Sequence, residues 1–252
     1  MTDSDLRPPI FIGGMFKSGT SLLRAMLGQH SAISAGLETA WFQLDWESGL
    51  GRGEEPLADY VSRTAGFYDE DPKVAQAMAV ASPDPEAFID TLLGASARRA
   101  GKARWAEKTP GNVRIADRIL RRWPDARLLH IIRDPRDTFA SLRQIGKWDT
   151  VPDFSSRWCD TFGAWTAFKE AGIVTNVNGL ELRYESLVRE PTATMGTVLE
   201  FLEEPWEPAT AQHQGQAQDF ERVQAATGKS STTLARLAEP LSDSRIGIWP
   251  QT

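Results

Sequence analysis

The hydrophobic positions of this chain fall into short continuous runs that alternate with stretches of helical spacing. Continuous apolar runs are typical of buried parallel strands, and they predict strands at residues 9–13, 33–35, 104–107, 127–132 and 180–184. Apolar residues at helical spacing, as at Phe88, Leu92, Leu93 and Ala97, are typical of helices. Helices are expected at residues 20–29, 73–81, 85–100, 112–123, 136–143, 154–171 and 192–202. The alternation predicts an α/β fold with a mostly parallel central sheet flanked by helices.

One tract departs from this alternation. Residues 41–72 are rich in glycine, proline and acidic residues and contain the run W-F-Q-L-D-W-E-S-G-L-G-R-G-E-E-P. Such a composition is typical of loops. We therefore expect residues 41–72 to form a surface insertion that is not part of the core.

Composition limits the classes to which the protein can belong. The chain has 252 residues, of which 41% are hydrophobic, and this suffices for a single domain over residues 1–252. A net charge of −6 argues against a nucleic-acid-binding surface, which would be basic. The N-terminus does not resemble an export signal, and no run approaches the roughly 20 apolar residues of a membrane span. The single cysteine, Cys159, fits a reducing compartment, so we expect a cytoplasmic protein without membrane contact.

Residues 10–30 carry the strongest chemical signal. They read I-F-I-G-G-M-F-K-S-G-T-S-L-L-R-A-M-L-G-Q-H, an apolar strand that passes through a glycine-rich turn into a helix. Glycines let backbone N–H groups approach an anion, and the positive end of the helix dipole points at the same place. The turn therefore predicts a phosphate-binding loop, and it makes the expected domain P-loop-like.

The lysine of this loop is not where a nucleotide triphosphatase has it. Those enzymes read G-x-x-x-x-G-K-[ST], with lysine directly after the second glycine and a magnesium-binding hydroxyl next. Here Thr20 follows Gly19, and the lysine is Lys17. Lys17 can reach the bridging oxygen of a terminal anhydride, while the hydroxyls of Ser18, Thr20 and Ser21 hold a phosphate. We therefore expect nucleotide binding that requires no metal.

Three blocks of the sequence resemble those of one enzyme family. K-S-G-T-S-L, after a strand, resembles the 5′-phosphosulfate loop of sulfotransferases that use 3′-phosphoadenosine 5′-phosphosulfate (PAPS). R-L-L-H-I-I-R-D-P-R-D-T-F-A-S-L-R, at residues 127–143, is similar to the 3′-phosphate segment, with Arg133 and Ser141 as the matching residues. L-R-Y-E-S-L-V-R-E-P, at residues 182–191, is similar to the segment that carries Tyr184 near the nucleotide. Arg133 also follows a predicted strand, so it lies on the same sheet edge as the glycine loop.

The resemblance implies a sulfotransferase that moves a sulfuryl group from PAPS to a hydroxyl or amine and releases adenosine 3′,5′-bisphosphate. In this reaction Lys17 would stabilise charge on the leaving phosphate. Lys108, in W-A-E-K-T-P, resembles the family lysine that contacts the transferring sulfuryl group, and Glu38, in G-L-E-T, resembles the base of protein-tyrosine sulfotransferases. Glu107 is an alternative base, although beside Lys108 it would more often form a structural ion pair. An ionised glutamate near two lysines has a lowered pKa, which weakens it as a base.

Other candidates are weaker. His30 ends the first predicted helix and is expected to pack or cap, His130 lies in an apolar strand, and His213 lies in a late loop. The stretch S-S-T-T-L-A-R-L, at residues 230–237, resembles the family's late serine-rich loop over the nucleotide. S-R-I-G-I-W, at residues 244–249, resembles the family's S-x-I-G-x-W.

The acceptor stays open at this point. The nine tryptophans include Trp41, Trp46, Trp148, Trp158 and Trp165, in or near the 41–72 insertion and the segment after residue 143. Aromatic walls suit a phenol, a glycan, a peptide tyrosine or a natural product equally. We expect the insertion to lie near the acceptor site. A small-molecule kinase of P-loop type and a non-catalytic nucleotide-binding protein are the alternative functions.

Overall fold

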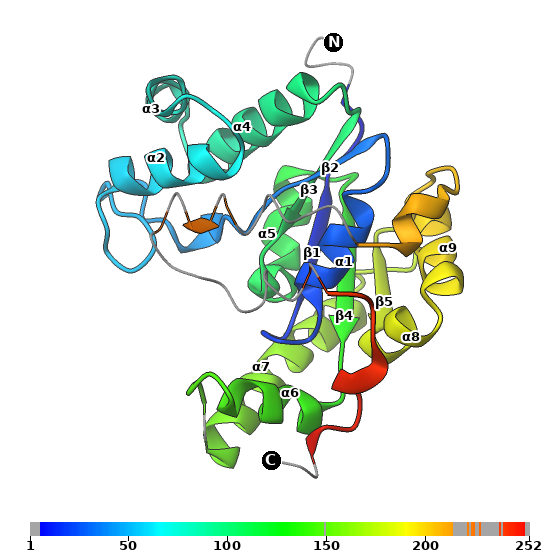
Figure 1. The fold of residues 1–252 in the computed structure, drawn as a ribbon. Helices are drawn as coiled ribbons and strands as arrows, with labels where there is room; N and C mark the ends of the chain where they lie inside the picture. The colour runs from blue at the N-terminus through cyan, green and yellow to red at the C-terminus, as the bar shows by residue number, and fades with distance from the viewer. Residues whose placement is uncertain are drawn as a thin grey trace.

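A parallel sheet forms the centre of the protein (Figure 1). The computed structural model describes residues 6–148, 150–213, 221, 223–224, 227, 237 and 239–249. In these residues the sheet has the strand order β2-β3-β1-β4-β5, and neighbouring strands are parallel. The strands are β1 (Ile10–Gly14), β2 (Ile33–Ala35), β3 (Arg104–Lys108), β4 (Arg127–Ile132) and β5 (Gly179–Arg183). The predicted α/β fold is confirmed, because each strand lies within one residue of its expected place.

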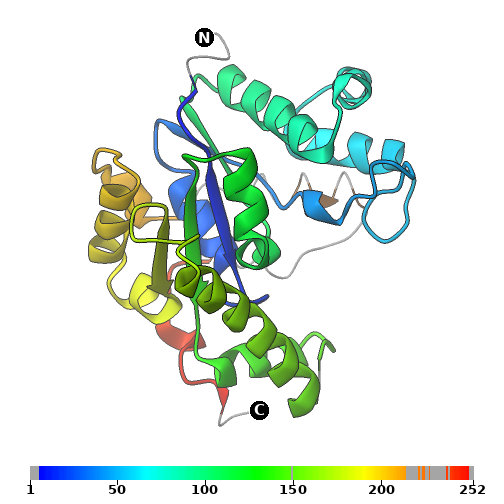
Figure 2. The same ribbon diagram turned by 180° about the vertical axis from the view of Figure 1, so that it is seen from behind.

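Side-chain alternation along the strands divides the core between two faces. Ile10 and Ile12 pack with α1 (Thr20–Leu27), α8 (Tyr184–Arg189) and α9 (Pro191–Phe201), the layer nearest the viewer and to the right in Figure 1. Phe11, between them, packs on the other face with α4 (Pro85–Arg99), α5 (Ala116–Arg122) and α7 (Val151–Glu170). Figure 2 shows α5 and α7 in front of the sheet and α4 beside it. Two layers of helices therefore cover a sheet that is apolar on both faces, as a parallel sheet requires.

Several helices begin where aspartate and proline stand together. In α3 (Pro72–Ala81), α4 and α6 (Pro135–Arg143), an aspartate side chain accepts a hydrogen bond from a backbone N–H of the first turn, and proline follows it. Proline has no N–H to leave unpaired, and its fixed φ suits the first helical turn. These starts lie within one residue of the predicted ones. The described part of the chain contains no helix long and apolar enough to cross a bilayer.

The segment predicted as one helix over residues 112–123 is divided. A short 3₁₀ helix covers Pro110–Arg114, and α5 begins at Ala116, because Ile115 between them has φ −132° and leaves the helical region. The side chain of Asn112 donates to the carbonyl of Ile12 at 3.1 Å, which ties the 3₁₀ turn to β1. This tertiary contact ends the helix that local spacing favoured.

The structure corrects the prediction for residues 41–72. Trp41 is fully buried, and α2 (Leu57–Phe67) buries Tyr60 and Val61 in the same cluster as Phe11 of β1. Three of the four glycines that suggested a loop lie in residues 47–56, where Leu50 forms isolated bridges with Asp45 and Pro56. The polar composition of that short stretch concealed the helical spacing that follows it.

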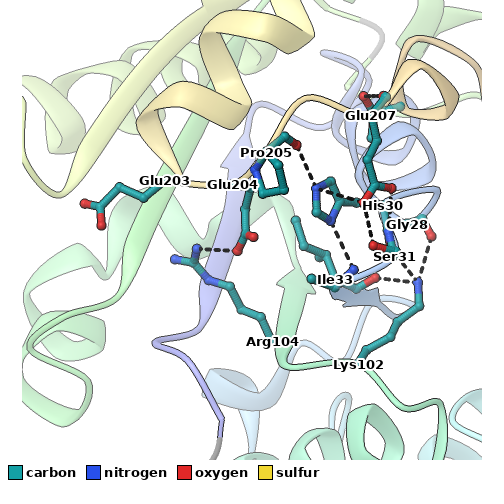
Figure 3. A network of polar contacts seen from close by, with 12 residues as sticks. Gly28, His30, Ser31, Ile33, Lys102, Arg104, Glu203, Glu204, Pro205 and Glu207 are labelled. Atoms are coloured by element: carbon teal, nitrogen blue, oxygen red, sulfur yellow. Dashed lines mark hydrogen bonds and ion pairs between the residues drawn. The ribbon is translucent and has the colours of Figure 1, made fainter.

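Polar side chains tie down the amino-terminal edge of the sheet (Figure 3). Arg104, the first residue of β3, donates from Nη1 to the carbonyl of Leu202 at 2.8 Å and to Glu204 Oε1 at 3.3 Å. The ammonium of Lys102 donates to three carbonyls, those of Gly28 at 3.1 Å, His30 at 3.0 Å and Ile33 at 2.7 Å. These bonds connect the end of α1, the start of β2 and the segment after α9.

His30 belongs to this structural network. Its ring is fully buried, Nδ1 accepts a hydrogen bond from the backbone N–H of Ala32 at 3.1 Å, and Nε2 therefore donates to the carbonyl of Pro205 at 3.0 Å. The prediction that His30 packs or caps is confirmed. The opposite, carboxyl-terminal edge is the one left to bind ligands.

Candidate active site

The loop between β1 and α1 has the geometry of an anion cradle. Gly19 precedes the first helical residue and has φ 104°, and a Cβ there would lie 2.5 Å from Cδ2 of Tyr184. A Cβ at Gly14 would lie 2.4 Å from the carbonyl oxygen of Ile131. Only glycine fits these two positions, and the predicted loop therefore sits against β4 and the Tyr184 ring with its backbone accessible to a ligand.

Lys17 has a left-handed backbone with φ 72°, and its carbonyl accepts a hydrogen bond from Arg133 Nη1 at 3.0 Å. This conformation costs of order 1–2 kcal/mol for a residue with a side chain, and such strain gathers at ligand sites. Beside it, Ser18 Oγ is buried and finds no hydrogen-bond partner among the residues that the structure describes. A buried hydroxyl in a glycine-rich loop fits a phosphate or sulfuryl oxygen as its partner.

Arg133 lies directly after β4, at the same edge of the sheet. Its Nη2 donates to the carbonyl of Arg245 at 2.6 Å, and its guanidinium lies 4.8 Å from the ring centroid of Tyr184. Burial lowers the pKa of Arg133, against the favourable field of Tyr184 and nearby acids. Its Nε is buried and has no partner in the described part of the chain, while Ser141 of α6 lines the same cavity. These donors suit a second anionic group, separate from the loop.

The segment that Arg245 belongs to passes across this edge, and Figure 1 shows it beside α6 and α8 in red. The buried carboxylate of Asp137, in the first turn of α6, accepts from the backbone N–H groups of Gly247 at 2.7 Å and Trp249 at 3.1 Å. The S-R-I-G-I-W segment is thus fixed beside Arg133. The predicted serine-rich loop at residues 230–237 lies, except for Leu237, outside the described residues.

Glu38 and Lys108 form an ion pair in the cavity. Lys108 Nζ lies 3.0 Å from Glu38 Oε2, and Arg52 Nη1 lies 3.3 Å from Glu38 Oε1. The lysine side chain is 8% exposed and the glutamate side chain 27% exposed. Burial would raise the pKa of Glu38, but the attraction of Lys108 and Arg52 outweighs it, and the pKa is lowered overall. Glu38 is therefore ionised and reachable at neutral pH.

Glu107 does not pair with Lys108, which corrects the expected ion pair. Successive residues of a strand point to opposite faces, so the two side chains diverge at the end of β3. Glu107 is fully buried and accepts hydrogen bonds from Thr39, Thr109 and Asn112, and burial raises its pKa despite these bonds. A carboxyl group without access to the cavity is a poor base for an acceptor there.

Of the remaining histidines, His130 lies inside β4 and His213 lines the cavity. Burial lowers the pKa of His130 to about 4, and its ring lies 4.9 Å from that of Trp165. The Nε2 atom of His213 lies 2.7 Å from the carbonyl oxygen of Glu239, within hydrogen-bond reach. Of the two glutamates considered as the base, Glu38 is the one that is both ionised and open to the cavity.

One cavity of about 840 Å³ brings together the predicted site residues except Ser18, which is buried behind its lining. Its lining includes Lys17, Gly19, Thr20, Ser21, Glu38, Lys108, Arg133, Ser141 and Tyr184. Sequence reasoning missed further basic residues that line it, Arg52, Arg63, Arg114, Lys147, Arg157 and Arg245. They are scattered along a chain of net charge −6, so only the folded structure shows that positive charge gathers here.

Comparisons with known proteins agree with this geometry. A sequence profile described as "Sulfotransferase family" matches residues 8–208. Protein-tyrosine sulfotransferase A of Caenorhabditis elegans is 30% identical over 217 residues, which cover 82% of this chain and 53% of that protein. Protein-tyrosine sulfotransferase 1 of Danio rerio is 29% identical over 258 residues, which cover 96% of this chain and 65% of that protein. The chain thus spans less than two thirds of the length of these two curated relatives.

Solved structures show the same fold. The sulfotransferase domain from the Synechococcus PCC 7002 olefin synthase superposes with a TM-score of 0.72 at 18% identity, covering 98% of this chain and 89% of that one. The sulfotransferase domain from the curacin biosynthetic pathway gives a TM-score of 0.62 at 20% identity and covers 98% of both chains. Because the family profile covers more than half of the chain, including every element from β1 to α9, the chain belongs to the sulfotransferase family.

Proposed function

We propose that this protein transfers a sulfuryl group from PAPS to a hydroxyl, or an amine, of an acceptor by in-line displacement. The observation that supports this best is that Lys17, Glu38 and Lys108 line one cavity with Arg133 and Ser141. One end of this cavity offers the phosphate loop, and the other donors suit a separate anionic group. PAPS has two such groups, the 5′-phosphosulfate and the 3′-phosphate, and it supplies an activated sulfuryl group.

The loop would hold the 5′-phosphosulfate. Backbone N–H groups at the start of α1 and the hydroxyls of Ser18, Thr20 and Ser21 donate to its oxygens. Arg133 and Ser141 would bind the 3′-phosphate, with the Tyr184 ring beside the nucleotide. These donors are all protein groups, so the proposed site requires no divalent metal.

Three side chains of the cavity would act on the chemical step. The bond between sulfur and the bridging oxygen breaks while the acceptor oxygen bonds to sulfur, and negative charge grows on the leaving phosphate. Lys17 stabilises that charge. Glu38 takes the proton of the acceptor, and Lys108 steadies the oxygens of the sulfuryl group.

The lowered pKa of Glu38 bears on its strength as a base. Lys108 holds the carboxylate ionised, but the same attraction weakens its pull on a proton. When sulfuryl oxygens of the bound donor also contact the Lys108 ammonium, the attraction between Lys108 and Glu38 weakens, and the pKa of Glu38 rises. The ion pair would then keep Glu38 ionised and correctly placed until the donor is bound.

The acceptor side of the cavity combines aromatic and basic side chains. Trp148 meets Phe16 at a ring distance of 6.3 Å, Arg157 lies 5.1 Å from the Trp148 ring, and Lys147 lies 5.2 Å from the Phe16 ring. This wall favours an acceptor that places a flat or apolar group beside negative charge. Gln43, Arg52, Arg63 and Phe67 bring the 41–72 tract to the same cavity, which supports its proposed place near the acceptor.

The experiment that tests this function compares two nucleotides and then measures transfer. In calorimetry, adenosine 3′,5′-bisphosphate should bind, and ATP with magnesium should not. The purified protein should also release 4-nitrophenolate from 4-nitrophenyl sulfate when adenosine 3′,5′-bisphosphate is present, because the reaction is then run in reverse. Tight binding of magnesium ATP, with no binding of the bisphosphate, would favour a kinase and refute the proposal.

A further inference from the structure

The carboxylate of Glu107 collects four hydrogen bonds at the end of β3. Oε1 accepts from the backbone N–H of Thr39 at 3.2 Å, from Thr39 Oγ1 at 2.8 Å and from Thr109 Oγ1 at 2.7 Å. Oε2 accepts from Asn112 Nδ2 at 2.7 Å. Glu107, Thr39 and Thr109 are each at most 3% exposed. These donors are all neutral, so the burial of this carboxyl group depends on the four hydrogen bonds.

Glu38 lies on a segment that depends on these bonds. Residues 37–40 have neither helical nor strand structure, and Ala40 has a left-handed backbone with φ 55°. The backbone N–H of Ala40 donates to Thr109 Oγ1 at 2.9 Å, so a second bond of the segment leads back to the same group of side chains. On its other side, the segment accepts at the carbonyl of Thr39 from Tyr60 of α2 at 3.1 Å.

Glu107 and Lys108 are neighbours in β3 with side chains on opposite faces, and both therefore act on Glu38. Lys108 contacts the Glu38 carboxylate directly, at 3.0 Å. Glu107 contacts the residue after Glu38 and fixes the backbone that carries it. Displacement of a reacting group by about 1 Å can cost about 100-fold in rate, so the position of this short segment matters.

We propose that Glu107 is a positioning residue, which holds Glu38 against Lys108 by binding Thr39 and Thr109. This inference rests on the proposed function, in which Glu38 is the base. A glutamine at position 107 could not reproduce the arrangement, because its NH₂ group would face either the backbone N–H of Thr39 or the NH₂ group of Asn112. Neither of these two groups can accept a hydrogen bond.

A matched pair of variants at Thr39 separates this role from general packing. Thr39→Val keeps the shape and removes the hydroxyl that donates to Glu107, whereas Thr39→Ser keeps the hydroxyl. Hydrogen-exchange mass spectrometry on the folded protein reads the effect without any substrate. Residues 37–41 should exchange at least about tenfold faster in Thr39→Val and Glu107→Gln, as expected for a lost buried hydrogen bond. Residues 13–19 of the phosphate loop should be unchanged.

The same variants are then compared in the transfer of a sulfuryl group from PAPS to phenol, a surrogate acceptor whose hydroxyl proton Glu38 would remove. We expect kcat to fall about 10- to 100-fold in Thr39→Val and Glu107→Gln, with the Kd of adenosine 3′,5′-bisphosphate changed less than about threefold. Thr39→Ser should restore both exchange and turnover. A purely structural role would lower the melting temperature without this division between kcat and Kd.

Three results would overturn the inference. Unchanged exchange of residues 37–41 in folded Thr39→Val and Glu107→Gln would show that the bonds do not hold the segment. Loosened exchange with full turnover, or a Thr39→Ser variant as slow as Thr39→Val, would show that positioning through the hydroxyl is not needed. If Glu38→Gln keeps full turnover, Glu38 is not the base, and that part of the proposed function is wrong. If Glu38→Gln loses turnover but Thr39→Val keeps it, only the positioning role is refuted.

Discussion

Replacing Arg133 by alanine removes two connections at once. The guanidinium donates to the carbonyl of Lys17 at 3.0 Å and to that of Arg245 at 2.6 Å, so it ties the phosphate loop to the segment that crosses the sheet edge. In the proposed site it also binds the 3′-phosphate. Arg133→Ala should therefore weaken every nucleotide that uses the loop, and it should weaken those with a 3′-phosphate more.

The two effects differ in size. Loss of the support to the Lys17 carbonyl costs roughly 0.5–1.5 kcal/mol for any adenosine 5′-phosphate, the net value of one hydrogen bond. Loss of a charge-assisted contact to the 3′-phosphate costs a further 1.5–3 kcal/mol, or about 10- to 150-fold in Kd. The loss of binding free energy is compared for a nucleotide with and a nucleotide without a 3′-phosphate. The difference between these losses gives the contribution of the 3′-phosphate contact, because the loop contribution is common to both nucleotides.

Calorimetry with adenosine 3′,5′-bisphosphate and adenosine 5′-monophosphate, on wild type and Arg133→Ala, measures this difference. Ser141→Ala is the matched control. It should weaken only the bisphosphate, by roughly 0.5–1.5 kcal/mol for one neutral hydrogen bond. If Arg133→Ala weakens both nucleotides equally, Arg133 is a structural residue and the 3′-phosphate assignment is wrong.

Binding of adenosine 3′,5′-bisphosphate should be the same in excess chelator, and a loss of tenfold or more, about 1.4 kcal/mol, would contradict the metal-free site. Lys17→Ala should lower kcat about 10²- to 10³-fold and Glu38→Gln about 10²- to 10⁴-fold, with melting temperatures near that of wild type in thermal scans. If the Lys17→Ala protein loses its fold, the loop has a structural role and not a catalytic one. If the Glu38→Gln protein keeps full turnover, Glu38 is not the base. The lowered pKa of Glu38 places the acidic limb of kcat/KM below the ordinary glutamate pKa, so Lys108→Met should raise that pKa and move the limb to higher pH. An unmoved limb would show that Glu38 does not govern it.

Much of the fold and of the nucleotide site could be predicted from local sequence. The strand of residues 10–14, the turn with Gly19 and the start of α1 at Thr20 follow from apolar runs, glycines and a helix start, all of which act within a few residues. The carboxyl ends of parallel strands meet at one edge, so the loop and Arg133 could be placed together without coordinates. Glycine turns, apolar runs and the alternation of side chains along a strand are local properties of the chain, so they can be read without knowing its packing.

What the tertiary structure decided is which distant side chains meet. The partner of Lys108 is Glu38, although Glu107 is its neighbour in the chain, because strand pleating sends adjacent side chains to opposite faces. The burial of α2 and the gathering of Arg52 with other basic residues around the cavity have the same origin. Local composition reports the preference of a segment, whereas its neighbours, and hence its burial and its charge environment, depend on packing between segments far apart in the sequence.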